Sequence, residues 1–209
     1  MSDKVDLASQ IIAAFADTEY PGDSFLLGST DGCEPYEVVS PFQGKDNWKT
    51  IDPELLDSSP EALSFFSEAA FRFFLPAYLV ADVHGKLERS DPLFHLTNGF
   101  HDQSVEIPLE ETILVRRFGQ STLVNPMRYG AMTFYDYARY RLSGFTREEA
   151  TAIVSYLRFR RDSDSTGLDR KAVEAALESY WVARAEDAPT AECLKQHLDA
   201  QSRLLKGLE

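Results

Sequence analysis

The residues with the most metal-like spacing in this chain lie between positions 162 and 174. Asp162, Asp164 and Thr166 occupy the first, third and fifth places of a calcium-binding helix–loop–helix, where oxygen ligands are needed. The twelfth place holds Val173 instead of a bidentate glutamate, and Glu174 comes one position late. The pattern therefore favours a solvated turn between two helices. The alternative is a weak calcium site with the ligands Asp162, Asp164, Thr166 and Glu174.

A second set of metal-type residues lies in the stretch that is hardest to interpret, residues 83–130. It comprises His84, His95, His101 and Asp102. Imidazole and carboxylate groups suit zinc or iron, but no pair of these residues has the i, i+4 spacing of a helical metal site. Surface or helix-capping histidines are the favoured interpretation, and a loop-borne metal site is the alternative.

Sequence signatures of the common catalytic classes are missing. The chain contains no nucleophile elbow, phosphate loop, dinucleotide-binding glycine fingerprint, zinc-binding helix motif or kinase signature. Its two cysteines, Cys33 and Cys193, are too few and too far apart to indicate a disulfide framework or a metal motif. These observations favour a protein that is not an enzyme, and they predict no cofactor.

The elements that position these residues are organised around residues 64–80, the most apolar and aromatic stretch of the chain. Ser67 is suited to begin a helix, because its oxygen can accept from the free amides of the first turn. The apolar residues that follow recur at i, i+3, i+4 and i+7. We therefore expect a buried central helix over about 67–83, kinked at Pro76, whose ring removes an amide donor.

Arg72 and Tyr78 are the residues with polar side-chain groups in the apolar part of this central helix. Arg72 lies one turn after Glu68, a natural ion-pair spacing on a helix. Together with Trp48, which stands between polar residues, Arg72 and Tyr78 would line a small-molecule pocket beside the kink. The pattern favours an ordinary core helix, and this pocket is the alternative.

The formal net charge of −13 is divided unevenly along the chain. Residues 1–66 carry 3 lysines against 13 acids, a net charge of −10, whereas residues 113–161 carry 9 arginines against 3 acids. The overall negative charge argues against binding to nucleic acid or to an anionic membrane surface. The central helix is also too short for a membrane span, which needs ~20 apolar residues.

The remaining periodicity predicts a mainly α fold. Apolar residues on one face predict helices over 6–16, 146–161 and 169–184, and a small β hairpin is the weaker expectation for 25–39. We expect one globular domain over 1–186. A C-terminal helix over 190–207 would dock on the domain or on a second subunit, which would make a dimer. No signal peptide is visible, so a cytoplasmic location is the default.

Several short stretches of the chain resemble a known family. They are 14–15, 20–22, 33–38, Trp48, 62–65 with the sequence Ala-Leu-Ser-Phe, and above all 70–79 with the sequence Ala-Phe-Arg-Phe-Phe-Leu-Pro-Ala-Tyr-Leu. Together they resemble a family of small bacterial proteins of unknown function, over roughly residues 11–160. This resemblance implies a mainly helical cytoplasmic domain, and it implies no activity, cofactor or catalytic residue.

Charge and missing motifs together favour a non-enzymatic binding protein. The acidic surface of residues 1–66 would meet a basic protein partner. Two alternatives stay open: a small-molecule enzyme or ligand binder with the Arg- and Tyr-lined pocket described above, and a weak metal-binding protein.

Overall fold

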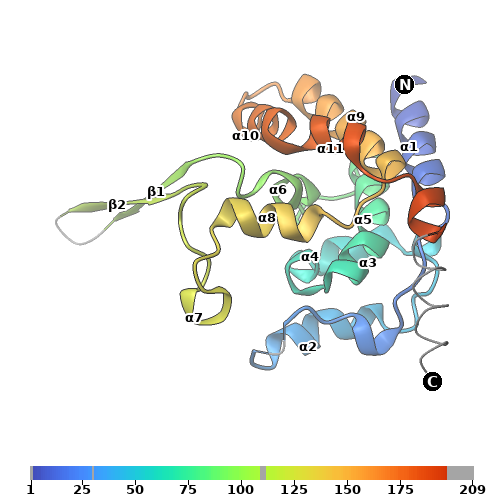
Figure 1. Ribbon diagram of the computed structural model, residues 1–209, viewed down its shortest axis with the longest axis horizontal. Coiled ribbons are helices and arrows are strands. Elements are labelled where there is room, and N and C mark those ends of the chain that lie inside the picture. The colour runs from blue at the N-terminus through green and yellow to red at the C-terminus, as the bar shows by residue number, and fades with distance from the viewer. Residues whose placement is uncertain (1, 30, 109–111, 197–209) are drawn as a thin grey trace.

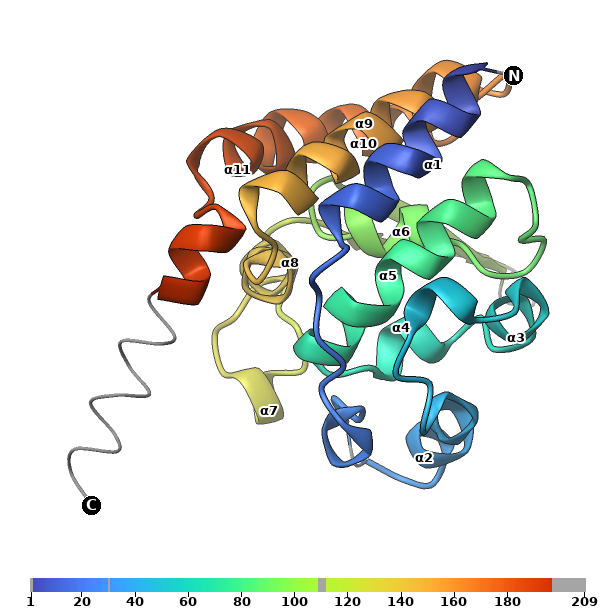
Figure 2. The same cartoon turned by 90° about the vertical axis from the view of Figure 1, so that its right-hand side faces the viewer.

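The computed structural model describes residues 2–29, 31–108 and 112–196, and it confirms a mainly α protein with a small β hairpin. Helix α5 (Glu68–Val83) lies in the middle of the helical body. Helices α1 (Ser2–Ala14) and α9 (Arg147–Ser163) run side by side across it (Figure 2). Helix α1 contacts both α9 and α5. Shorter helices pack below α5 (Figure 1).

The central helix begins and ends close to where the sequence predicts. The Ser67 hydroxyl accepts a hydrogen bond from the Ala70 N–H (3.1 Å) and donates one to the Phe25 carbonyl (2.6 Å). The second bond connects the start of the helix to the segment around Phe25. Helix α5 continues through Pro76 without interruption, and the predicted kink stays a prediction. Its buried residues cover most of its circumference: Ala70, Phe71, Phe73, Phe74, Leu75, Pro76, Ala77, Tyr78, Leu79, Ala81 and Val83.

An aromatic cluster fills the space below α5. Phe66 stacks on Phe74 with ring centroids 4.8 Å apart, and Phe42 meets both rings edge-on at 5.0 and 5.2 Å. Tyr20 closes the cluster from the segment after α1. Such offset and edge-to-face contacts add to the apolar burial that stabilises the core.

The N-terminal lobe consists of short helical pieces, and the β hairpin predicted at 25–39 is wrong. Residues 34–39 form a helix, and Leu27 only makes an isolated bridge to Phe66. The Pro35 ring in the first helical turn suits a helix start rather than a strand. The pieces are η1 (Asp23–Phe25), α2 (Glu34–Val39), η2 (Ser40–Phe42), η3 (Trp48–Thr50), α3 (Pro53–Ser58) and α4 (Ala62–Phe65).

Three C-terminal elements pack on α9: α10 (Arg170–Ala176), the π-helical turn η4 (Leu177–Trp181) and α11 (Val182–Asp187). Helix α8 (Phe134–Leu142) precedes α9 in the chain. Thr146 and Glu149 form a capping box at the start of α9. Of the helix predicted over 190–207, residues 191–196 are helical, residue 190 is not, and 197–207 lie outside the described residues.

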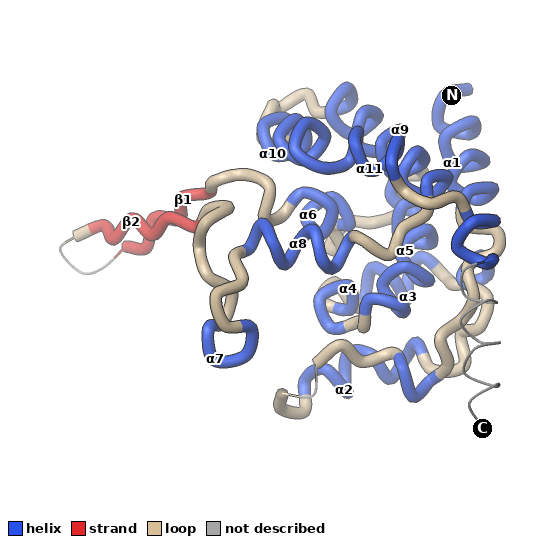
Figure 3. The backbone as a smooth tube through the Cα atoms, viewed as in Figure 1, coloured by secondary structure: helices blue, strands red, loops and turns tan. Residues whose placement is uncertain are grey.

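The hairpin that the protein does contain lies in the stretch that the sequence left unassigned. Strand β1 (Gln103–Pro108) pairs antiparallel with β2 (Ile113–Phe118), so that Ile107 lies opposite Leu114. Figure 3 shows the two strands projecting from the helical body. Helix α6 (Pro92–Thr97) precedes the hairpin, and α7 (Pro126–Tyr129) follows it.

Candidate functional site

Arg72, one of the three predicted ligand-binding residues, forms an ion pair within the protein. Its Nε lies 3.1 and 2.9 Å from the two carboxylate oxygens of Glu149, and its Nη2 lies 2.9 Å from Oε1. The predicted pairing with Glu68 is therefore wrong. Glu149 is only 2% exposed, and it also accepts hydrogen bonds from the Thr18 hydroxyl and from the Thr146 N–H. This shared carboxylate joins α5, α9 and the segment after α1.

The other two predicted ligand residues, Tyr78 and Trp48, lie in the core. The Trp48 indole N–H donates to the Phe15 carbonyl at 3.3 Å. Tyr78 is fully buried, its hydroxyl has no hydrogen-bond partner among the described residues, and burial strongly raises its pKa. The three predicted residues thus contact different partners, and the ligand pocket beside Pro76 stays a prediction.

Two surface pockets lie elsewhere on the protein. One, of about 530 Å³, lies between α3 and residues 85–89, and the other, of about 600 Å³, lies between α1 and α9. Arg72, Tyr78 and Trp48 line neither of them.

The loop predicted as a turn or calcium site is folded around one carboxylate. Asp164 accepts hydrogen bonds from the N–H groups of Thr166, Gly167 and Asp169 and from the Thr166 hydroxyl, at 2.7 to 3.0 Å. These bonds stabilise the charged form and lower the pKa of Asp164 to about 2. Asp162 pairs with Arg161, and Glu174 is exposed on α10. No group of metal-type side chains suited to holding an ion occurs in residues 2–29, 31–108 and 112–196.

The histidines of the unassigned stretch lie in separate elements. His84 is exposed at the end of α5, and His101 lies just before β1. His95, on α6, packs against the rings of Phe71 and Phe94. Burial, reinforced by the charge of Arg141, lowers the pKa of His95 to about 3, so its ring is neutral at physiological pH.

Arg141, on α8, is a residue that the sequence analysis did not single out. Its guanidinium lies 4.7 Å from the centre of the Phe71 ring and donates to the Leu63 carbonyl and the Tyr137 hydroxyl. Its Nε is buried without an acceptor, and no carboxylate pairs with Arg141 within the described part of the chain. The sequence showed an excess of arginine here, but not which one lacks a counter-ion.

A half-buried charged cluster joins α5, α9 and α10. The Tyr156 hydroxyl and the Arg160 guanidinium each lie 2.6 Å from the Asp82 carboxylate, and Arg160 also reaches Asp169 at 3.5 Å. Asp91 caps α6 through the Leu93 N–H. Although the Asp91 residue as a whole is exposed, partial burial of its carboxylate raises its pKa, and the charge of Arg160 opposes this shift. The cluster therefore holds more carboxylates than cations.

The carboxylates of the N-terminal lobe, by contrast, face solvent. The exposed ones are Asp6, Asp17, Glu19, Asp23, Asp31, Glu34, Glu37, Asp46, Asp52, Glu54 and Glu61. Between positions 17 and 61, the ion pairs formed within the described residues engage only Asp31, which lies 2.9 Å from Arg128. Most of the negative charge predicted for this region is therefore not neutralised inside the protein.

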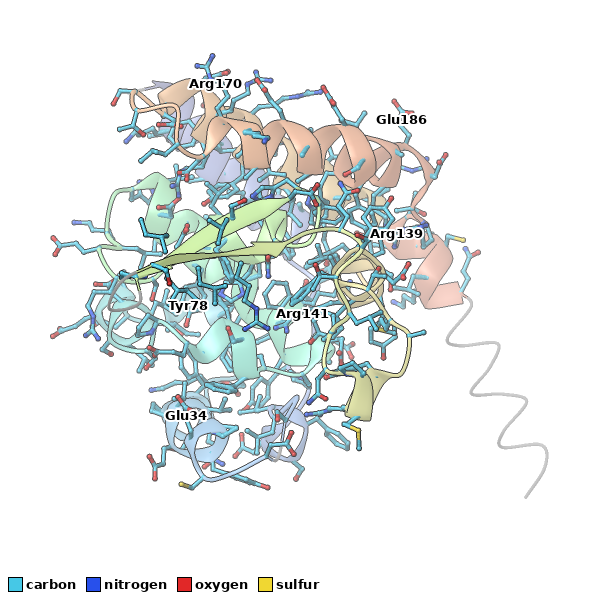
Figure 4. The ribbon with its side chains drawn as sticks, turned by 90° about the vertical axis from the view of Figure 1, so that its left-hand side faces the viewer. Glu34, Tyr78, Arg139, Arg141, Arg170 and Glu186 are labelled. Carbon is cyan, nitrogen blue, oxygen red and sulfur yellow. The ribbon has the colours of Figure 1, made fainter. Side chains whose placement is uncertain are left out.

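Helix α2 concentrates this charge beside exposed aromatic rings. Glu34 and Glu37 lie on α2, Asp31 precedes it, and Tyr36 between them is 49% exposed. Phe25, in η1 of the same lobe, is 67% exposed. Figure 4 shows Glu34 at one end of the molecule, far from Glu186. We call Asp31, Glu34, Tyr36 and Glu37 the α2 surface.

Comparison with known proteins finds a family model that matches part of the chain. Residues 3–98 match the model of a family of unknown function (DUF6714). This stretch includes α1 to α6, and so both the central helix and the α2 surface, but not the hairpin or α8 to α11. No curated protein and no solved structure matches the chain significantly. The predicted likeness to a family of unknown function is supported over these residues, and its bacterial origin stays a prediction.

None of the helices in the described residues combines the length and the apolar character that a membrane crossing needs.

Proposed function

We propose that this protein is a non-enzymatic binding protein whose α2 surface receives a basic segment of a partner protein. The observation that carries the proposal is the exposed, largely unpaired negative charge of the N-terminal lobe. Exposed carboxylates of one sign attract and orient a basic partner, and they act mainly on the rate of association.

The aromatic ring on the α2 surface supplies a contact that charge alone does not. Tyr36 stands between Glu34 and Glu37 in sequence and is about half exposed. A lysine or arginine of the partner can pack over this ring while pairing with a neighbouring carboxylate. Tyrosine is also among the residues that most often dominate binding energy at interfaces. The α2 surface thus fits a basic segment rather than an apolar one.

The test compares two variants with the same change in net charge. Glu34→Lys with Glu37→Lys reverses the charge of the α2 surface, and Glu186→Lys with Asp187→Lys reverses two exposed charges on α11. Immobilised proteins capture partners from lysate, and the affinity for the captured basic protein is then measured by titration calorimetry. We expect the α2 variant to weaken binding by about tenfold or more at low salt, and the α11 variant to leave it unchanged.

Equal losses in both variants would show that only net charge matters and would contradict a site on α2. Capture that is unaffected by Glu34→Lys with Glu37→Lys would contradict the proposal altogether.

A second candidate function is the binding of a small anion at Arg141. In this form of the ligand-binding hypothesis, Arg141 takes the role that the sequence suggested for Arg72. It is supported by the half-buried guanidinium that pairs with no carboxylate in the described residues. A partly buried cation without a counter-ion loses some of its hydration, so an anion that supplied the missing charge would stabilise the fold. Small carboxylates and phosphates should then raise the melting temperature of the protein but not that of an Arg141→Met variant.

A further inference from the structure

An arginine of the chain itself occupies one end of the α2 surface. Arg128, on α7, places its Nη1 2.9 Å from the Oδ2 atom of Asp31 and 3.3 Å from the Ser29 hydroxyl. Its Nη2 lies 3.3 Å from the Gly28 carbonyl. Figure 1 shows α7 on the side of the molecule where α2 begins. Three acceptors that lie 97 to 100 positions away in the chain therefore surround one guanidinium.

These three acceptors suit a guanidinium better than an ammonium group. A guanidinium presents its donors in a fixed planar fork, and here Nη1 and Nη2 of Arg128 donate to different acceptors. A lysine ammonium is a point charge on a flexible stem, and it does not match a spread set of acceptors in the same way. We call Gly28, Ser29 and Asp31 the guanidinium site, and their arrangement favours arginine.

The acceptors of the guanidinium site are held in place by other parts of the protein. The Gly28 N–H donates to the Phe65 carbonyl at 2.7 Å, and a Cβ at position 28 would lie 2.6 Å from the Phe66 carbonyl oxygen. Position 28 must therefore be glycine for its backbone to approach the end of α4 this closely. The Ser29 hydroxyl also accepts from the Asp31 N–H at 3.4 Å. None of these contacts involves Arg128, so they position the acceptors independently of it.

Arg128 is held at the guanidinium site only weakly. Its side chain is 38% exposed, and the Asp31 side chain is 79% exposed. Exposed ion pairs contribute little to stability, because water screens the charges and two side chains lose freedom. Helix α7 is anchored separately, since Asn125 caps its first turn and Tyr129 packs on Tyr137 with ring centroids 5.3 Å apart. Arg128 can therefore leave the site by side-chain rotation alone while α7 stays in place.

We propose that Arg128 is an internal competitor for the partner's basic segment, and that an arginine of this segment replaces it at the guanidinium site. The inference rests on the function proposed for the α2 surface, and it names the residue type that this surface selects. Glu34 and Glu37 form no ion pair within the described residues, so further cations of the segment pair with them. The contact with Arg128 excludes segments whose charge is too weak to displace it.

The probe is a short fluorescent peptide in which arginine alternates with serine, and its counterpart carries lysine in place of arginine. Fluorescence anisotropy with the full-length protein at low salt should show saturable binding of the arginine peptide. The lysine peptide should bind at least about threefold more weakly, because it carries the same charge without the planar fork. Equal affinities for the two peptides would show that the surface reads charge alone and would overturn the guanidinium site.

Removal of the internal competitor tests the contact directly. Arg128→Met should raise the affinity for the arginine peptide by about three- to fivefold, because a larger fraction of the protein then has a free site. Arg139→Met is the matched control: it removes an exposed arginine of α8 that forms no ion pair in the described residues, and it changes the net charge equally. The control should alter the affinity by less than about twofold. Equal gains in both variants would overturn the proposal.

A double-mutant cycle distinguishes displacement of Arg128 from its repulsion of the peptide at a distance. In an Asp31→Asn background Arg128 has lost its charged partner, so Arg128→Met should no longer raise the affinity for the arginine peptide appreciably. The same gain in both backgrounds would show that Arg128 acts only as a repelling charge, and the internal competitor would then be wrong.

The charge reversal on α2 separates this inference from the proposed function. Glu34→Lys with Glu37→Lys should abolish binding of the arginine peptide if the proposed function is correct. That loss, together with no gain in Arg128→Met, would overturn the internal competitor and leave the proposed function standing. Failure of the arginine peptide to bind both the unaltered protein and Arg128→Met would contradict both proposals.

Discussion

Phe71, Phe74 and Leu75 of α5 are fully buried, whereas Ile113, Leu114 and Val115 of β2 are half exposed or more. Both are short runs of large apolar residues in regular structure. On α5 they meet helices from both sides, and on β2 they meet solvent on both faces. The difference shows that apolar character alone does not place a residue in the core. A stretch must also belong to an element that other elements cover.

The two regions also differ in how their polar groups are satisfied. Beside α5, Glu149 accepts hydrogen bonds from a guanidinium, a hydroxyl and a backbone N–H. Along the outer edge of β2, no neighbouring strand in the described residues provides such partners. Polar groups beside α5 are therefore satisfied inside the protein, whereas the outer edge of β2 leaves backbone groups without a strand to pair with in the described residues.

The largest expected effect comes from truncating the aromatic cluster under α5. Phe74→Ala should lower the free energy of unfolding by about 3 to 5 kcal/mol, because it removes a buried ring and leaves a cavity. The matched change on the hairpin, Leu114→Ala, should alter it by less than about 0.5 kcal/mol. Urea denaturation measures both. Similar losses in the free energy of unfolding of the two variants would show that the hairpin is covered in solution, and would contradict the contrast between α5 and β2.

A smaller effect is expected from the shared carboxylate. Glu149→Gln should destabilise the protein by about 2 to 3 kcal/mol, because it removes the ion pair with Arg72 and disturbs the capping box of α9. A double-mutant cycle with Arg72→Met isolates the pairwise energy. A coupling near zero would show that Arg72 is free to bind a ligand after all.

Two buried tyrosines give a third, more local comparison. Tyr156→Phe should cost about 1 to 2 kcal/mol, because its hydroxyl donates to Asp82 and accepts from Arg160. Tyr78→Phe should change stability by less than about 0.5 kcal/mol, because its hydroxyl has no partner in the described residues. Thermal and urea unfolding measure both variants. A loss of more than 1 kcal/mol for Tyr78→Phe, on this same scale, would reveal an unseen partner of the hydroxyl.

The smallest expected effect concerns pH and Asp91. Because burial raises the pKa of Asp91, its ionisation opposes folding, and the associated stability is lost as the pH rises through that pKa. Asp91→Asn keeps the cap on α6 and should stabilise the protein at pH 7 by less than about 1 kcal/mol. The gain should disappear when unfolding is measured at pH 3. A variant that is less stable at pH 7 would show that the attraction of the Arg160 charge outweighs burial.

Much of the helical framework was predictable because its signals are local. The Ser67 cap, the Asp52 cap before Pro53 and the capping box at Thr146 each involve residues within one turn of one another. Helical periodicity likewise predicted α5 and α9. The predicted hairpin at 25–39 failed because short apolar runs suit either structure, and packing against α4 favoured the helix α2 there.

The candidate sites were harder to predict than the helices. Exposure of the acidic lobe followed from composition, because charged side chains avoid the core unless they are paired. The predicted ligand residues were chosen from one helix and its neighbours, whereas Arg141 meets the Leu63 carbonyl across 78 residues of chain. No local spacing reports such a contact.

The sequence by itself determined where the main helices begin and end and which half of the chain carries the negative charge, because capping, periodicity and charge act over one or two turns. Only the tertiary structure decided what each polar group meets. Arg72 lies one turn from Glu68 but pairs with Glu149, 77 residues away. In the same way, the exposure of the apolar residues of β2 follows only from the place of the hairpin outside the helical body. Burial depends on which elements cover a strand, and that is settled by long-range packing.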